Sequence, residues 1–168
     1  PSGRNPKDFW NYSGGDYAGT WKKRGKGQPF FTVYNIGDSH ESRAFGDHKD
    51  ESVDPKKMIL APYHPDLPEM RNTYAKYSSA ISKMDSLVGQ AIENLKQDRL
   101  YEDTIIVYNS DHGGVLARSK RFLYSSGIHC PLIVRIPAKW KHLYPKGKPP
   151  GSTIDRIVSF IDMPKTWV

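Results

Sequence analysis

The residues best suited to chemistry begin at Asp111, which stands beside His112 directly after a short apolar run. Lys120 follows a few positions later, in a basic segment. Aspartate and histidine can bind a divalent metal, and a lysine can hold an oxyanion beside it. Adjacent side chains of an extended chain point in opposite directions. Both could therefore reach one metal only if the backbone turns, and the two glycines after His112 allow a turn.

A second polar segment, residues 37–43, also follows an apolar run and contains His40. His40 could donate a hydrogen bond to an oxyanion, and Glu41 or Arg43 could shape the same site. His64 stands between two prolines in a long loop, which would hold it rigidly. It either lines a substrate subsite or is an ordinary surface residue.

The elements that must position these side chains are short buried strands. Residues 104–108 are apolar and β-branched, and residues 29–36 and 132–134 are also apolar runs. Each of these runs is typical of a buried strand. Polar residues follow two of them, and open α/β sheets place their ligands beyond strand ends.

A long helix is expected over residues 66–100. Asp66 and Glu69 resemble a capping pair at its start, and apolar residues recur along one face. That face contains Tyr74, Tyr77, Ile81, Met84, Val88, Ile92 and Leu95. A core-packing helix before the strand at residues 104–108 gives a strand–helix–strand order, so the sequence predicts an α/β fold with a layered sheet flanked by helices.

Composition narrows the classes of function. The chain has 168 residues and a formal net charge of +7, which favours anionic partners. No apolar run approaches the roughly 20 residues of a membrane span. The single cysteine, Cys130, excludes an internal disulfide and a cysteine-based zinc site. Residues 1–28 are expected to form an irregular arm. The residues at both ends of the chain suggest that it is part of a longer protein.

Several of these residues together resemble the C-terminal half of a sulfatase catalytic domain, within the alkaline-phosphatase-like superfamily. Many sulfatases have asparagine after the metal-binding aspartate, whereas this chain has His112. His40 holds the position of a sulfate-contacting histidine in the family. The other matching positions are Asp111, Gly113, Lys120, Tyr124, Gly127, Pro131 to Val134 and the stretch from Val158 to Asp162.

The resemblance implies roles for the polar residues. Asp111 and His112 would bind a metal, with Ca²⁺ suggested by the family and Mn²⁺ or Zn²⁺ left open by the imidazole. Lys120 and His40 would contact the sulfate oxygens, and either could protonate the leaving group. Residues 29–168 would then form an incomplete alkaline-phosphatase-like catalytic domain.

The family's nucleophile is not in this sequence. Sulfatases carry a Cys/Ser-x-Pro-x-Arg motif whose first residue becomes formylglycine, and no such motif occurs among the 168 residues. The formylglycine is therefore expected in a preceding segment, and this chain alone is expected to hydrolyse no sulfate ester. The resemblance implies a sulfated carbohydrate or aryl sulfate as substrate, and an exported protein.

Two other functions remain open. A phosphodiesterase or phosphonate hydrolase of the same superfamily would use the same aspartate–histidine pair. A non-catalytic module could use the basic loops to bind an anionic polymer, with a glycan favoured over nucleic acid.

Overall fold

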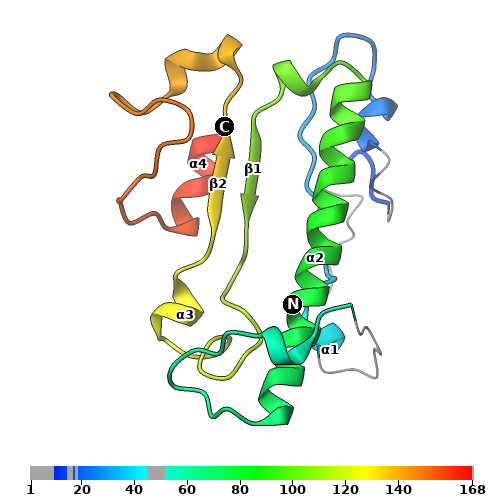
Figure 1. Ribbon diagram of the computed structural model, residues 1–168. Coiled ribbons are helices and arrows are strands. Elements are labelled where there is room, and N and C mark those ends of the chain that lie inside the picture. Colours follow the sequence, from blue (N-terminus) through cyan, green and yellow to red (C-terminus); the bar gives the residue numbers. More distant parts are fainter. Residues whose placement is uncertain (1–9, 15–16, 18, 45–51, 168) are drawn as a thin grey trace.

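The computed structural model describes residues 10–14, 17, 19–44 and 52–167. Its helices and strands are α1 (Glu41–Ala44), α2 (Pro68–Gln97), β1 (Ile106–Asn109), α3 (Ser125–Ile128), β2 (Leu132–Arg135) and α4 (Met163–Trp167). Short 3₁₀ helices lie at Thr20–Lys23, Pro55–Lys57, Tyr101–Asp103, Ala138–Leu143 and Phe160–Asp162. Figure 1 shows β1 and β2 side by side, with α2 running alongside them.

The sheet of the described residues contains two strands rather than a layered set. β1 pairs with β2 in antiparallel register, with Ile106 opposite Arg135 and Asn109 opposite Leu132. The layered sheet expected from the sequence is therefore not seen in the part of the chain that the structure describes. Among the described residues, the runs before and after the Asp111 segment are the ones that pair with each other.

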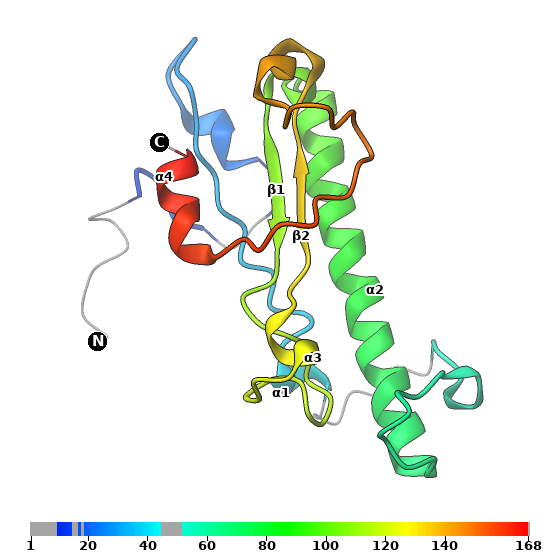
Figure 2. The same ribbon diagram turned by 90° about the vertical axis from the view of Figure 1, so that its left-hand side faces the viewer.

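The third expected strand, residues 29–36, is extended but belongs to no ladder of the described residues. Its exposure alternates as in a strand, with Phe31 and Val33 exposed and Thr32 and Tyr34 half-buried. Figure 2 shows this segment running beside the two strands. The apolar pattern correctly indicated an extended conformation for this segment. A β-ladder also requires hydrogen bonds to the backbone of a neighbouring strand, which the pattern of one segment does not specify.

Helix α2 confirms the long helix predicted near residues 66–100, but its start differs from the prediction. Leu67 is the N-cap and no side chain caps the helix. Asp66 instead pairs with Arg71, whose guanidinium Nη2 lies 2.7 Å from a carboxylate oxygen. The predicted capping pair of Asp66 and Glu69 was therefore wrong, because an arginine one turn into the helix competes for the carboxylate.

The buried core of the described residues is small. Its buried apolar side chains are those of Trp21, Ala75, Ala91, Leu95, Val115, Pro137 and Met163. Trp21 comes from the N-terminal arm, and its indole donates a hydrogen bond of 2.7 Å to Asp98 at the end of α2. Leu132, Ile133 and Val134 of β2 are all exposed.

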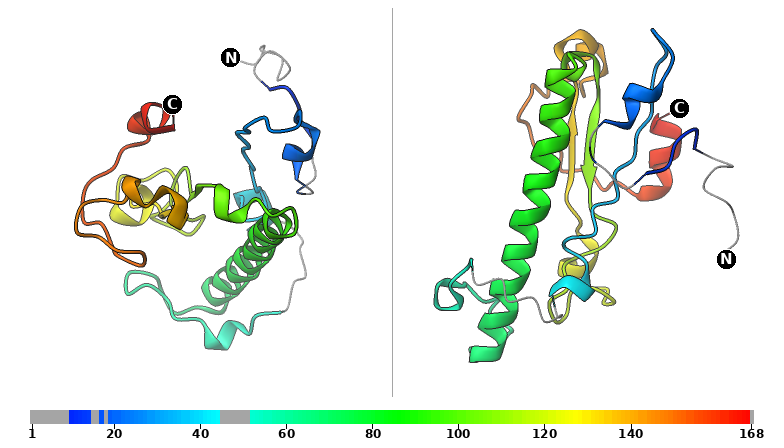
Figure 3. Two further views of the ribbon diagram at one scale, coloured as in Figure 1. Left: turned by 90° about the horizontal axis from the view of Figure 1, so that it is seen from above. Right: turned by 90° about the vertical axis from the view of Figure 1, so that its right-hand side faces the viewer.

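The elements lie on two sides of the paired strands. Seen from the side, α2 lies on one side, whereas α4 and residues 29–36 lie on the other (Figures 2 and 3). Phe31 and Trp167 join that second group, with ring centroids 5.9 Å apart. Among the helices of the described residues, none has the length and apolar character that crossing a bilayer requires.

Candidate anion and metal site

The candidate site lies where the chain leaves β1. Pairing continues beyond the strand, because the amide of Ser110 donates to the carbonyl of Pro131 at 3.3 Å and that of Gly113 donates to Gly127 at 2.9 Å. Figure 1 shows α1 and α3 at the same end of the molecule, and a carboxylate oxygen of Glu41 in α1 lies 3.3 Å from the ammonium of Lys120. The segments that contain His40 and Lys120 therefore meet beyond the carboxyl end of β1.

Gly113 and Gly114 are needed for close packing. Neither has a positive φ, so the left-handed freedom of glycine is not what the segment uses. A Cβ on Gly113 would collide with the carbonyl oxygen of Ser126 and would lie 2.7 Å from the Cα of Gly127. A Cβ on Gly114 would lie 2.6 Å from the hydroxyl of Tyr77. The two glycines thus let the segment after His112 lie directly against α3 and α2.

Asp111 and His112 point toward one another. The Nε2 atom of His112 lies 3.7 Å from Oδ1 of Asp111, whose side chain is 87% exposed. The Nδ1 atom of His112 lies 2.7 Å from the carbonyl oxygen of Gly113. A carbonyl can only accept, so Nδ1 carries the proton and Nε2 of the neutral ring presents a lone pair.

This geometry fits half of a metal site. A cation bonded at about 2.0–2.5 Å to two neighbouring ligands holds their atoms about 3–4 Å apart, and the measured separation is 3.7 Å. The carboxylate suits Ca²⁺ and the imidazole also suits Mn²⁺ or Zn²⁺. No group of three or more potential ligands occurs among the described residues, so Asp111 and His112 are two ligands that need further donors.

Lys120 belongs to a charge cluster with Glu41 and Arg121. One oxygen of Glu41 lies 3.3 Å from the Lys120 ammonium and 2.7 Å from the Arg121 guanidinium. Two cations and one carboxylate leave a charge of +1, and the Lys120 side chain is only 18% exposed. The cluster can therefore still attract an anion.

Glu41 is ionised within this cluster. Its partial burial acts to raise the pKa, but hydrogen bonds and charges from Lys120 and Arg121 together hold the pKa of Glu41 below its ordinary value. Glu41 thereby joins the segment after residues 29–36 to the segment after β1. The sequence suggested that Glu41 could shape the site, but it did not show that Lys120 is its partner.

His40 has the opposite proton arrangement to His112. Its Nδ1 atom accepts a hydrogen bond from the backbone amide of Ser42 at 3.3 Å, and it lies 3.0 Å from the Ser42 hydroxyl. Since an amide can only donate, the proton of the neutral ring is on Nε2. His40 is exposed and can donate from Nε2 to an external anion. The side chain of Arg43 lies outside the described part of the chain.

His64 uses both ring nitrogens within the protein. Its Nε2 atom lies 3.0 Å from the carbonyl of Ala117 and its Nδ1 lies 2.7 Å from the hydroxyl of Tyr74, which accepts from the amide of Ala61 at 3.0 Å. The hydrogen bonds run in one direction, from Ala61 through Tyr74 and His64 to Ala117. A substrate contact from His64 stays a prediction, and it would require one of these bonds to break.

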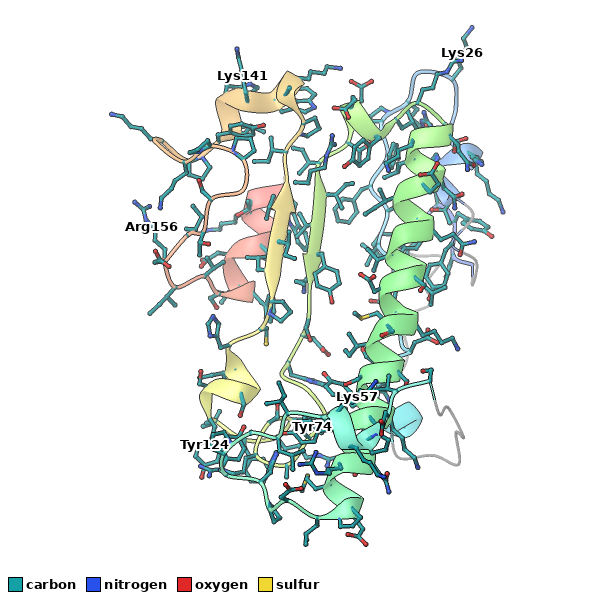
Figure 4. All side chains as sticks on the ribbon, viewed as in Figure 1. Lys26, Lys57, Tyr74, Tyr124, Lys141 and Arg156 are labelled. Atoms are coloured by element: carbon teal, nitrogen blue, oxygen red, sulfur yellow. The ribbon has the colours of Figure 1, made fainter. Side chains whose placement is uncertain are left out.

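The structure thus places the predicted residues in three groups. These are Asp111 with His112, the His40 segment with Lys120, and His64 with Tyr74. Asp111 lies beside His112, and the backbone amide of Lys120 donates to the carbonyl of Gly114 at 2.9 Å, which closes the turn that follows this pair. Glu41 connects the His40 segment to Lys120. Figure 4 shows Tyr74, the partner of His64, at the same end of the molecule as Tyr124.

Enzymes that act on tetrahedral anionic esters typically use metal-ligand donors, a cationic cluster and an N–H donor, and the segments beyond β1 and residues 29–36 carry one of each. The sequence profile of the sulfatase family matches residues 15–168. The chain therefore belongs to the sulfatase family. No solved structure matches it.

Three curated relatives indicate the range of similarity. An ulvan-active sulfatase from Formosa agariphila is 31% identical over 198 residues, which cover 96% of this chain and 31% of the relative. Arylsulfatase K from Homo sapiens is 28% identical over 104 residues, covering 60% of this chain and 18% of the relative. An endo-4-O-sulfatase from Bacteroides thetaiotaomicron is 25% identical over 126 residues, covering 67% and 24%. The chain thus spans less than a third of the length of each.

Proposed function

We propose that this chain forms the C-terminal part of a sulfatase catalytic domain, and that the longer protein hydrolyses the sulfate ester of a sulfated carbohydrate or an aryl sulfate. Family membership supports the reaction class. The relatives named for ulvan and for 4-O-sulfate groups support a glycan substrate. The proposal includes the layered α/β fold, because the exposed apolar residues of β2 are suited to packing beneath further elements.

One observation carries this proposal, namely that Nδ1 of His112 faces a carbonyl oxygen whereas Nδ1 of His40 faces a backbone amide, which assigns opposite tautomers to the two neutral rings. His112 presents an unprotonated Nε2 beside Asp111, as a metal ligand requires. His40 presents a protonated Nε2, as an oxyanion donor requires. The chain's own hydrogen bonds set both states, so each ring is prepared for its role before any ligand binds.

In the proposed reaction, Lys120 and His40 hold the sulfate oxygens. Glu41 lies 3.3 Å from the Lys120 ammonium and fixes its position, and this ammonium can pass a proton to the departing oxygen. The neutral ring of His40 donates a hydrogen bond from Nε2 to a sulfate oxygen. Asp111 and His112 would hold the metal, which supplies charge stabilisation to the sulfate oxygens when bound. The nucleophile would come from the part of the domain that carries the formylglycine.

Nitrogen-15 NMR of the histidine side chains tests this directly in the 168-residue chain. In the neutral rings, the proton should be on Nδ1 of His112 and on Nε2 of His40. Ca²⁺, Mn²⁺ or Zn²⁺ should perturb Nε2 of His112, and this change should disappear in Asp111→Asn. Inorganic sulfate should perturb Nε2 of His40, and this change should weaken in Lys120→Ala.

Two results would count against the proposal. One is a proton on Nδ1 of His40, and the other is sulfate binding that does not change in Lys120→Ala. A parallel titration with inorganic phosphate tests the phosphodiesterase alternative. That alternative predicts that the chain binds phosphate more tightly than sulfate. The purified 168-residue chain should show no turnover of 4-nitrophenyl sulfate, whereas the longer protein with its formylglycine should turn it over.

A further inference from the structure

Arg118 lies between two tyrosine rings, an environment that differs from those of the other arginines among the described residues. Its guanidinium carbon lies 4.3 Å from the ring centroid of Tyr124 and 4.8 Å from that of Tyr63. Both distances are typical of cation–π contacts. Tyr63 belongs to the loop before α2 and Tyr124 to the segment after β1, so the arginine joins two parts of the chain that are distant in sequence.

The positive charge of Arg118 has no carboxylate partner among the ion pairs of the described residues. In contrast, Arg71 pairs with Asp66 and Arg121 pairs with Glu41. The Arg118 side chain is exposed, so the edge of its guanidinium that the rings do not cover can reach an external anion. A guanidinium presents a planar set of N–H donors that match a carboxylate or a sulfate.

The backbone holds Arg118 in a fixed place. Its φ is 62°, in the left-handed region that few residues other than glycine adopt. Its carbonyl oxygen accepts a hydrogen bond of 2.7 Å from the hydroxyl of Ser126, and the preceding carbonyl, that of Ala117, accepts from His64 at 3.0 Å. Such unfavourable conformations persist where surrounding contacts determine them, and they cluster at functional sites.

The aromatic residues around Arg118 are available for contact. Tyr63 and Tyr124 are 46% and 49% exposed. The ring of Tyr124 stacks on that of Phe122, with centroids 6.2 Å apart. Partly exposed aromatic faces pack against the C–H faces of sugar rings through apolar contact. Figure 4 shows Tyr124 at the end of the molecule that contains the candidate site.

Arg118 also precedes Lys120 by two positions, in a segment whose turn is closed by the bond from the Lys120 amide to Gly114. Because the two residues are so close in the chain, we expect a glycan whose sulfate lies at Lys120 to place a neighbouring sugar near Arg118. We propose that Arg118, Tyr63 and Tyr124 form a subsite for an acidic sugar, with Arg118 binding its carboxylate or a second sulfate and the tyrosines contacting the ring. This inference rests on the proposed function of Lys120.

The test is NMR titration of the isotope-labelled 168-residue chain with three probes. Chondroitin 4-sulfate tetrasaccharide carries carboxylates and sulfates, hyaluronan tetrasaccharide carries carboxylates only, and 4-nitrophenyl sulfate has no sugar. Arg118→Gly removes the guanidinium, and glycine accepts φ of 62° without strain. The variant should therefore keep its fold, which the spectrum of the free chain checks.

We expect Arg118→Gly to weaken binding of chondroitin 4-sulfate tetrasaccharide about tenfold, as the loss of one charge-assisted contact predicts, and to leave 4-nitrophenyl sulfate unchanged. Weaker binding of hyaluronan as well would identify the carboxylate as the group bound, and an effect on the sulfated probe alone would identify the sulfate. Arg118→Lys should restore only part of the affinity, because it lacks the planar donor set.

Arg156→Gly is the matched control, since it also removes one exposed arginine charge, and Figure 4 shows Arg156 far from Tyr124. It should leave all three probes unaffected. The inference is wrong if Arg118→Gly binds both tetrasaccharides like the unaltered chain, or if Arg156→Gly weakens them equally. Failure of the proposed function is separate, because it would show as unchanged binding of 4-nitrophenyl sulfate in Lys120→Ala.

Discussion

Substitution of Gly113 by alanine tests whether the segment after His112 must lie against α3. The added Cβ would meet the carbonyl oxygen of Ser126, and it would lie 2.7 Å from both the Cα of Gly127 and the hydroxyl oxygen of Ser119. Two of these atoms belong to the backbone, so no side-chain rotation relieves the contact. The segment or α3 must move.

The size of the effect follows from this packing. Inserting a methyl group into a closely packed region costs about 1–3 kcal/mol, and a collision with backbone atoms favours the upper part of that range. For a chain of 168 residues, each kcal/mol changes Tm by about 2–4 °C. Gly113→Ala should therefore lower Tm by about 5–10 °C. It should also weaken metal binding, because Gly113 supplies the carbonyl that orients His112.

Gly89→Ala is the matched control within the same chain. Gly89 lies in α2, is exposed, and has no atom within 4 Å of an added Cβ. Alanine at an exposed helix position should stabilise by about 0.5–1 kcal/mol. Thermal unfolding followed by circular dichroism measures both variants. A Gly113→Ala chain as stable as the unaltered chain would refute the close packing of this segment.

Three further outcomes are expected. Glu41→Gln should lower Tm at neutral pH, because the folded-state pKa of Glu41 is lowered and its ionised carboxylate therefore stabilises the folded chain. This stabilisation is complete above the ordinary pKa of 4.5 and is lost as the pH falls through the folded-state pKa, so the effect of the substitution should disappear at a pH well below 4.5. A Tm difference that does not shrink as the pH falls below 4.5 would contradict this. Tyr74→Phe should cost about 1 kcal/mol in urea unfolding, since the hydroxyl joins Ala61 to His64; an unchanged midpoint would contradict the role of this hydroxyl. Asp111→Asn should abolish the metal response in calorimetry while leaving Tm unchanged, because the side chain is 87% exposed, and a large fall in Tm would mean a structural role.

The elements that position the site were predictable because their signals are local. The apolar run before Asp111 became β1, and the run after Cys130 became β2. The three- and four-residue spacing of apolar side chains became α2. In each case, the pattern of one segment decides its conformation, and the polar residues at the end of β1 follow from chain continuity.

Contacts between distant segments were not predictable in the same way. Nothing in the spacing of Glu41 and Lys120 shows that they lie 3.3 Å apart. The same holds for His64, whose prolines suggested rigidity but not the hydrogen bonds to Tyr74 and Ala117 that occupy its ring. The expected capping role of Asp66 failed for a related reason, because local rules do not include competition from Arg71.

The sheet differs from prediction because strand pairing depends on neighbours. Residues 29–36 have the alternating exposure of a strand, and β2 exposes Leu132, Ile133 and Val134. Apolar side chains of this kind are stable when covered, and each hidden square ångström contributes about 25 cal/mol. Sequence patterns thus specify segments suited to a larger sheet, whereas the described residues complete only one pair of strands.

Glu41 gives the candidate site a balance that a simple cationic cluster would lack. An anion site with two uncompensated cations would bind both the substrate and the released sulfate tightly. Tight binding that is equal in the ground state and the transition state does not speed the chemical step. One carboxylate shared by Lys120 and Arg121 lowers the charge of the cluster to +1. The lysine is then held in place by an internal partner and remains a donor to an anion. Under the proposed function, Arg118, which has no carboxylate partner among the described residues, is left to bind the rest of the substrate, so discrimination between substrates and contact with the sulfate would rest on different residues.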